Sequence, residues 1–211
     1  GPVQASLSYT PLVLGMMVGT MVIVRLATRF DARRLIAGGL LLAAIGMIAL
    51  APIGTQTPLP YLIIPFAAVG LGLGITGPAR TSVILTAPPP RLIGSGAGIN
   101  SGAGMAGYAL GVITSSVFLS GLAGNALANQ LRQAGVPQDA ITQVQSSLGT
   151  VFARAMSGDY TKLPTNADQS LTAFFGPAFT TAMGQTMLIM GGIAAAAAVA
   201  IYLAMERGLK G

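Results

Sequence analysis

The sequence predicts an all-α membrane protein with five transmembrane helices. The chain of 211 residues is 53% hydrophobic and only 8% charged, whereas a soluble domain carries about a quarter charged residues. Its apolar residues fall into five runs, and each is long enough to cross a bilayer, since roughly 20 residues span the hydrocarbon core. The arginines collect mainly at the ends of these runs, as in the short cytoplasmic loops of membrane proteins.

The first predicted helix covers residues 7–26, and a basic segment follows it. This segment, VRLATRFDARRLIAGG at residues 24–39, contains four arginines and one acid, namely Arg25, Arg29, Arg33, Arg34 and Asp31. Lys and Arg resist translocation, so a dense basic turn between two apolar runs indicates a cytoplasmic loop. Asp31 is expected in the turn itself, because Asp tolerates tight-turn geometry.

The next three helices are expected at residues 35–51, 61–86 and 93–122. Pro52 and Gly54 end the first of them, and the three prolines at residues 88–90 end the second, because proline cannot continue a helix interior without losing a hydrogen bond. The third is long and very rich in glycine and other small residues. A last helix is expected at residues 175–205, which become almost pure Ala, Ile and Val towards their end.

A polar segment separates the fourth helix from the last. Residues 124–170 contain Asn, Gln, Asp, Arg and Lys, so they are too polar to cross and predict an extracytoplasmic loop. Apolar residues at helical spacing within it predict an amphipathic helix over residues 137–155: Ile141, Val144, Leu148, Val151, Phe152 and Ala155. As a helix, this segment could act as a lid or lie on the membrane surface. Alternatively, it could be a loop that packs on the ends of the transmembrane helices.

The distribution of charge predicts the orientation. With the basic loop, the 88–92 turn and the C-terminus on the inside, the inner side holds eight basic and two acidic residues: Arg25, Arg29, Arg33, Arg34, Arg80, Arg91, Arg207, Lys210, Asp31 and Glu206. The outer side holds three of each: Arg132, Arg154, Lys162, Asp139, Asp159 and Asp168. Lys and Arg near helix ends set orientation, so five crossings place the N-terminus outside and the C-terminus in the cytoplasm.

Composition argues against several classes of function. The chain has no Cys and no His, which removes the commonest general base and metal ligand. A serine hydrolase would need a base near Ser101 or Ser115, and none is evident. The pI near 10.3 does not indicate nucleic acid, because the basic residues form no patch. We therefore expect no enzyme, no cofactor, no metal and no nucleic-acid partner.

Three segments resemble a known family. They are PVQASLSYTPLVLG, VRLATRFDARRLIAGGLLLAAIGM, and GLGLGITGP together with GSGAGINSGAGMAGYALGVITSSV. They resemble the C-terminal part of a major facilitator superfamily transporter, and more narrowly the fourteen-helix drug:proton antiporters. The resemblance covers nearly the whole chain. It implies that the five helices are the second to sixth of one six-helix transporter domain.

The resemblance implies proton-coupled multidrug efflux by alternating access in the cell membrane. Its partners would be the lipid bilayer, apolar or cationic small molecules, and an N-terminal transporter half that lies upstream in the same polypeptide or in a separate chain. The five predicted helices contain no Asp or Glu, and in this family the proton-titrating acids sit mostly in the N-terminal helices. The alternative is a non-transporting membrane subunit or scaffold that needs a separate partner chain.

In the family, the basic loop between the first two helices of this chain is linked to gating. Arg29, Arg33 and Arg34 keep the basic positions of its motif. Val24 and Asp31 stand where the motif has glycines, and Thr28 stands where it has an acid. The resemblance therefore implies a cytoplasmic gating loop, and Thr28 weakens the case for an ion-pair latch in it.

Five residues are candidates for a substrate cavity. Arg80 lies inside an apolar run, about 9 Å from its inner end at 1.5 Å per residue, so it either snorkels to the interface or lines a cavity and pairs with an acid. Asn100 and Ser101 either form an interhelical hydrogen bond or face the cavity. Met16 and Tyr9 would supply adaptable surface for varied ligands, or simply fill space.

Glycines four residues apart predict close helix packing. The pairs are Gly70 and Gly74, Gly98 and Gly102, and Gly107 and Gly111. Residues 72–77 match the pattern GxGxxG, but they lie inside an apolar run rather than after a strand, which argues against a dinucleotide site. A smooth glycine face would also let helices rock during alternating access.

Overall fold

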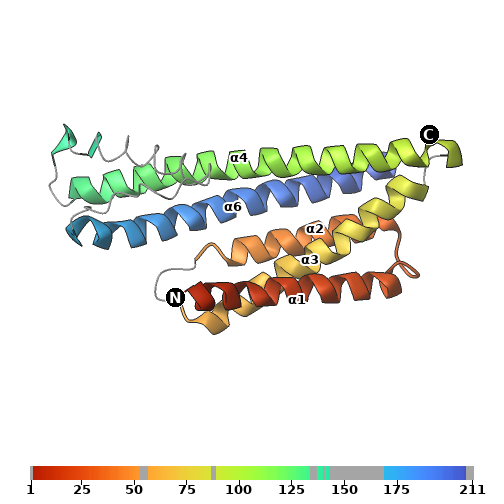
Figure 1. The fold of residues 1–211 in the computed structure, drawn as a ribbon, viewed down its shortest axis with the longest axis horizontal. Coiled ribbons are helices and arrows are strands. Elements are labelled where there is room, and N and C mark those ends of the chain that lie inside the picture. The colour runs from red at the N-terminus through yellow and green to blue at the C-terminus, as the bar shows by residue number, and fades with distance from the viewer. Residues whose placement is uncertain are drawn as a thin grey trace. The chain divides into compact units, whose positions relative to one another are not determined.

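The computed structural model describes residues 2–52, 57–86, 89–133, 137–139, 141–142 and 169–207. Its regular structure is helical throughout these residues. Five long helices, each with a stretch long and apolar enough to cross a membrane, follow one another along the described chain (Figure 1): α1 (Pro2–Leu26), α2 (Ala32–Ala49), α3 (Leu59–Thr86), α4 (Ile93–Gln133) and α6 (Gln169–Arg207). A 3₁₀ turn, η1 (Pro90–Leu92), precedes α4.

The chain divides into two compact units. Unit 1 consists of Gly1–Leu50, Pro58–Ala109 and Met187–Gly211, and unit 2 consists of Ala51–Thr57 and Leu110–Thr186. Unit 1 thus contains α1, α2 and α3, together with the first part of α4 and the last part of α6.

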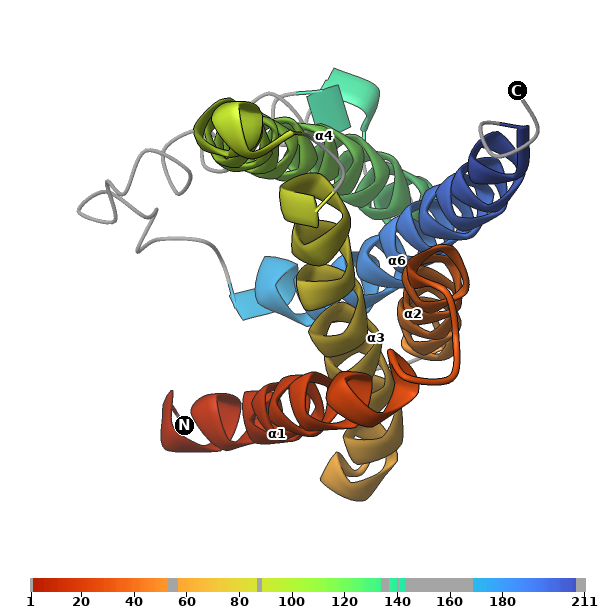
Figure 2. The ribbon, with the colours of Figure 1, turned by 90° about the vertical axis from the view of Figure 1, so that its right-hand side faces the viewer.

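In unit 1, α3 packs against both α1 and α2, and it crosses α1 in both views (Figure 1 and Figure 2). Glycines on α1 allow this crossing. A Cβ atom added to Gly15 would lie 2.5 Å from the carbonyl oxygen of Ala67, and one added to Gly19 would lie 2.6 Å from that of Leu71. The two backbones therefore meet directly, as small residues permit between membrane helices.

Glycines also line the contacts that α2 makes. A Cβ atom on Gly46 would lie 2.8 Å from the carbonyl oxygen of Pro65 on α3. Gly39 of α2 and Gly72 of α3 face each other, since a Cβ atom on Gly72 would overlap the carbonyl oxygen of Gly39. Because these positions carry no side chain, the α2 backbone can approach the α3 backbone closely.

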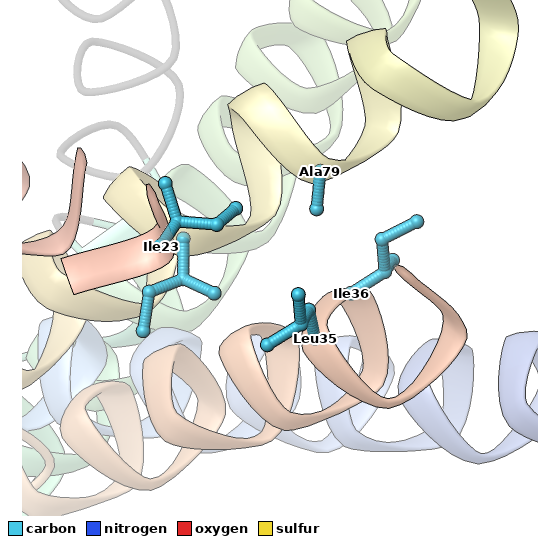
Figure 3. Packing of buried hydrophobic residues seen from close by; sticks show 5 residues of the cluster. Ile23, Leu35, Ile36 and Ala79 are labelled. Atoms are coloured by element: carbon cyan, nitrogen blue, oxygen red, sulfur yellow. The ribbon is translucent and has the colours of Figure 1, made fainter. Parts of the chain in front are cut away.

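A hydrophobic cluster joins α1, α2 and α3 next to the basic loop. Ile23 of α1, Leu35 and Ile36 of α2, and Ala79 of α3 gather around one space (Figure 3), and Ile75 of α3 completes the buried set. Half-buried apolar residues pack around them: Leu26, Leu40, Leu71, Val83 and Ile201. The cluster therefore holds the end of α1 and the start of α2 against α3.

Unit 2 is built around the second part of α4. Its buried residues there follow helical spacing: Ala123, Leu127, Ala128 and Leu131. Ile141 is fully buried as well, and its N–H donates to the carbonyl oxygen of Pro137 at 3.2 Å. Arg132 Nε donates to Gln138 Oε1 at 3.3 Å.

The structure corrects the predicted boundaries of the polar loop. Residues 124–133, which were expected to be loop, continue α4 to Gln133, and α6 begins at Gln169 rather than near residue 175. Hydropathy underestimates α4 because Asn125, Asn129 and Arg132 are interspersed with its buried apolar residues. Most of the amphipathic helix predicted at 137–155 lies outside the described residues.

The start of α1 also differs from the expectation. This helix begins at Pro2 rather than near residue 7, and proline is favoured at the first helical position, where its missing N–H is not needed. Pro11 consequently lies inside the helix. Proline inside a membrane helix is tolerated when neighbouring helices satisfy the freed backbone groups.

Candidate functional site

The basic loop is a tight connection between α1 and α2. The N–H of Phe30 donates to the carbonyl oxygen of Leu26 at 2.9 Å, which closes the turn. Asp31 then occupies the N-cap of α2 in an extended conformation, and its side chain makes no capping hydrogen bond. Its carbonyl oxygen accepts from the N–H groups of Arg34 at 2.9 Å and Leu35 at 3.2 Å. The Asp31 carboxylate lies at the positive end of the α2 dipole, where negative charge is favoured.

The arginines of this loop differ in their surroundings. Arg25, Arg29 and Arg34 are exposed, whereas Arg33 is half-buried. The guanidinium carbon of Arg33 lies 3.9 Å from the ring centroid of Tyr202 on α6, which is cation–π geometry. Sequence reasoning did not find Tyr202, because no local pattern links two residues so far apart in the chain.

A small pocket adjoins the basic loop. It has a volume of about 310 Å³. Side chains from α1, the loop, α2 and α3 line it: Ile23, Val24, Ala27, Phe30, Ala32, Leu35, Pro78, Ala79 and Ser82. The connection between α1 and α2 is therefore placed against α3, so a movement of α3 would reach the loop directly.

Two of the predicted packing glycines, Gly70 and Gly74, lie against the backbone of α1. A Cβ atom on Gly70 would overlap the carbonyl oxygen of Leu12, and one on Gly74 would overlap that of Met16. Gly15 and Gly19 of α1 line the same crossing and are also four residues apart, a spacing that was not singled out from the sequence.

The other predicted glycines, Gly98, Gly102, Gly107 and Gly111, lie on α4. A Cβ atom on any of them would meet no other atom within 4 Å in the part of the chain that the structure describes. Their role in helix packing stays a prediction.

Four of the five cavity candidates are exposed: Tyr9, Met16, Arg80 and Ser101. The ring of Tyr9 stands edge-on to that of Phe66 on α3, with centroids 5.6 Å apart and planes at 64°. Met16 meets α3 through its backbone, at Gly74. Their role in a substrate cavity stays a prediction.

Arg80 contacts the face of α4 on which Asn100 lies. One guanidinium nitrogen of Arg80 lies 3.8 Å from the position that a Cβ atom on Gly104 would occupy. Asn100 precedes Gly104 by four residues, so both lie on the same face of α4. Asn100 Oδ1 is buried and has no hydrogen-bond partner among the described residues. The structure therefore groups a cation and an unused acceptor beside α4.

Sequence reasoning also missed an apolar groove between α1, α2 and α3. Its volume is about 820 Å³. The residues that line it are apolar except for one threonine: Thr10, Pro11, Leu14, Gly15, Val18, Leu42, Pro60, Leu62, Ile63, Ala67, Ala68 and Leu71. A groove of this size and composition suits an apolar molecule or an acyl chain.

The sequence profile of the Major Facilitator Superfamily matches residues 1–128. The chain belongs to the Major Facilitator Superfamily. The matched residues include α1, α2, α3 and most of α4. This Major Facilitator chain is accordingly a multi-pass membrane protein of a transporter family, whose members are generally not enzymes.

Two relatives of this Major Facilitator chain carry names that describe drug resistance. The puromycin resistance protein of Streptomyces alboniger is 36% identical over 115 residues, which are 53% of this chain and 23% of that protein. The tetracenomycin C resistance and export protein of Streptomyces glaucescens is 24% identical over 202 residues, which are 95% of this chain and 37% of that protein. The chain thus spans well under half of either relative. No solved structure matches it.

Proposed function

We propose that this chain forms part of the C-terminal half of a proton-coupled exporter of apolar and cationic drugs. The observation that carries the proposal is its similarity, over 95% of its length, to a protein named for resistance and export. A second relative is named for resistance to puromycin. The whole exporter would consist of these helices and an N-terminal half supplied by the rest of the polypeptide or by a separate chain.

Alternating access is the mechanism we propose. The glycine-lined crossing of α1 and α3 supports it, because contacts such as those at Gly70 and Gly74 present backbone rather than interlocked side chains. Helices with such smooth faces can shift against each other around a site near the membrane midplane. The basic loop, placed against α3, would then respond to that shift as a cytoplasmic gate.

Proton coupling would depend on residues outside this chain. The apolar stretches of the five helices contain no Asp or Glu, and intramembrane carboxylates are the usual proton carriers in transporters. We therefore assign the proton-binding acids to the N-terminal half. The orientation that we propose has the N-terminus outside, the basic loop in the cytoplasm, and the C-terminus in the cytoplasm of a cell-membrane protein.

The test is export by intact cells. The polypeptide that carries these residues would be produced in a drug-sensitive bacterium that lacks its own major exporters. Cells should accumulate less ethidium and grow at higher puromycin concentrations than cells with an empty vector, and a protonophore should abolish the difference in ethidium accumulation. Unchanged accumulation at a verified membrane level of the protein would contradict export and favour the alternative, a non-transporting scaffold.

A further inference from the structure

The guanidinium of Arg80 lies beside the interior of α4 rather than at its end. Arg80 belongs to the membrane-spanning stretch of α3, and its side chain is exposed. It reaches Gly104, which lies about 16 Å along α4 from Ile93 at 1.5 Å per residue. A snorkelling arginine would instead carry its charge towards the helix end and the interface. Arg80 therefore presents a positive charge at membrane depth.

An unused hydrogen-bond acceptor lies on α4, one helical turn from the glycine that Arg80 reaches. Asn100 precedes Gly104 by one helical turn, about 6 Å along the axis, and shares its face. Its Oδ1 is buried without a hydrogen-bond partner in the described structure. A buried carbonyl oxygen without a partner costs free energy, so this position favours a molecule that brings a donor.

The apolar stretches of the described helices supply no counter-charge for Arg80. They contain no Asp or Glu, and the acid of the basic loop, Asp31, lies at the N-cap of α2. A cation inside a membrane protein is normally paired or faces a water-filled cavity that holds its ligand. The oxyanion that completes this site must therefore come from outside these stretches.

We propose that Arg80 and Asn100 form a binding site for an anionic substrate that carries a hydroxyl or N–H donor close to its negative charge. Arg80 would donate two parallel N–H bonds to a carboxylate, which is the strongest arrangement for this pair. Asn100 Oδ1 would accept from the neighbouring hydroxyl. Gly107, one turn further along the same face as Gly104, leaves open space for the ligand in the described structure.

This site rests on the proposed export function and extends it from apolar and cationic compounds to anionic ones. A carboxylate could come from two sources, namely the substrate or an acidic residue in the rest of the polypeptide. The two sources make different predictions. A substrate site binds the charged form of a compound more tightly than the neutral form. Breaking a protein ion pair instead weakens the binding of every substrate equally.

The experiment measures binding of three matched fluorescent probes to the purified whole polypeptide in detergent. They are 3-hydroxy-2-naphthoate, its neutral methyl ester, and 2-naphthoate, which lacks the hydroxyl group. The wild type should bind 3-hydroxy-2-naphthoate roughly tenfold or more tightly than the ester, because hydrogen bonds to a charged group are lost in the ester. It should bind 2-naphthoate with an affinity between the two.

Three variants assign these differences to residues. Arg80→Gln should bind the acid and the ester about equally, and Arg80→Lys should keep part of the preference, since it keeps the charge without the planar fork. Asn100→Leu should bind 3-hydroxy-2-naphthoate no better than 2-naphthoate. Arg91→Gln is the matched control, because it removes an exposed arginine in η1 and should leave all three affinities unchanged.

Two outcomes would overturn the proposal. Equal binding of the acid and the ester by the wild type would show that no oxyanion site exists, whatever the variants do. A loss of ethidium binding in Arg80→Gln that equals its loss of 3-hydroxy-2-naphthoate binding would assign Arg80 to a protein ion pair. Ethidium export by cells separates the two proposals. If cells export ethidium but the protein does not bind the acid, only this binding site is contradicted. If the protein binds the acid but cells do not export ethidium, only the proposed function is contradicted.

Discussion

The side chain of Arg33 lies over the ring of Tyr202, with its guanidinium carbon 3.9 Å from the ring centroid. Arg33 belongs to the first turn of α2, and Tyr202 belongs to the last turns of α6. The contact therefore ties the basic loop to a helix distant in sequence. It also distinguishes Arg33 from Arg25, Arg29 and Arg34, which are exposed.

Removing the Tyr202 ring should destabilise the protein slightly. A cation–π contact contributes about 0.5–2 kcal/mol, so Tyr202→Leu should lower the melting temperature of the detergent-purified protein by a few degrees. Tyr202→Phe keeps the ring and should melt close to the wild type. If the Phe and Leu variants lose equal stability, the ring face does not hold Arg33.

Adding one methyl group at Gly70 should disturb the α1–α3 crossing. A Cβ atom there would overlap the carbonyl oxygen of Leu12, whereas one at Gly77 of the same helix meets nothing within 4 Å in the described structure. Gly70→Ala should cost about 1–3 kcal/mol, as overpacking does. Gly77→Ala should be neutral or slightly stabilising, because Ala is the better helix former. Equal melting temperatures for Gly70→Ala and Gly77→Ala would argue against this close crossing of α1 and α3.

Truncating Ile23 should weaken the cluster beside the basic loop. Ile23 is 6% exposed, and its neighbour Val24 is 70% exposed. Ile23→Ala should cost about 2 kcal/mol or more, because it leaves a cavity between three helices. Val24→Ala leaves no cavity and should cost under about 1 kcal/mol. Thermal unfolding in one detergent compares them, and an equal loss in both would place Ile23 outside the core.

Single cysteines can test the proposed orientation. The chain contains no Cys, so Thr28→Cys in the basic loop and Thr142→Cys before α6 introduce one thiol each; cysteines elsewhere in the polypeptide would be replaced by serine. Both positions are exposed. In intact cells, an impermeant maleimide should label Thr142→Cys at once and Thr28→Cys only after the membrane is opened. Labelling of both from outside would reverse or remove the predicted topology.

The helices follow from the sequence better than their ends do. Long apolar runs predicted all five, because hydrophobic length is the main requirement for crossing a bilayer. The ends of α4 and α6 were wrong because Asn125, Asn129 and Gln169 lower the local hydropathy without preventing a helix. Helix formation and membrane insertion have different requirements, and hydropathy reports only the second.

The site residues were less predictable, because their roles depend on contacts between distant segments. A polar residue in an apolar run is visible in the sequence, which is how Arg80 and Asn100 were found. That Arg80 reaches α4 at Gly104 is visible only in three dimensions, as is the contact between Arg33 and Tyr202. Glycine spacing indicated a close crossing at Gly70 and Gly74, but it could not name the helix on the other side.

Transport by the purified protein in lipid vesicles tests the central claim most directly. The whole polypeptide would be reconstituted, and ethidium uptake would be followed after an acidic interior is imposed. If protons leaving the vesicle are exchanged for ethidium entering it, ethidium uptake should stop when nigericin collapses the pH gradient. Uptake that is the same with and without the gradient, or no uptake by correctly folded protein, would contradict a proton-coupled drug exporter.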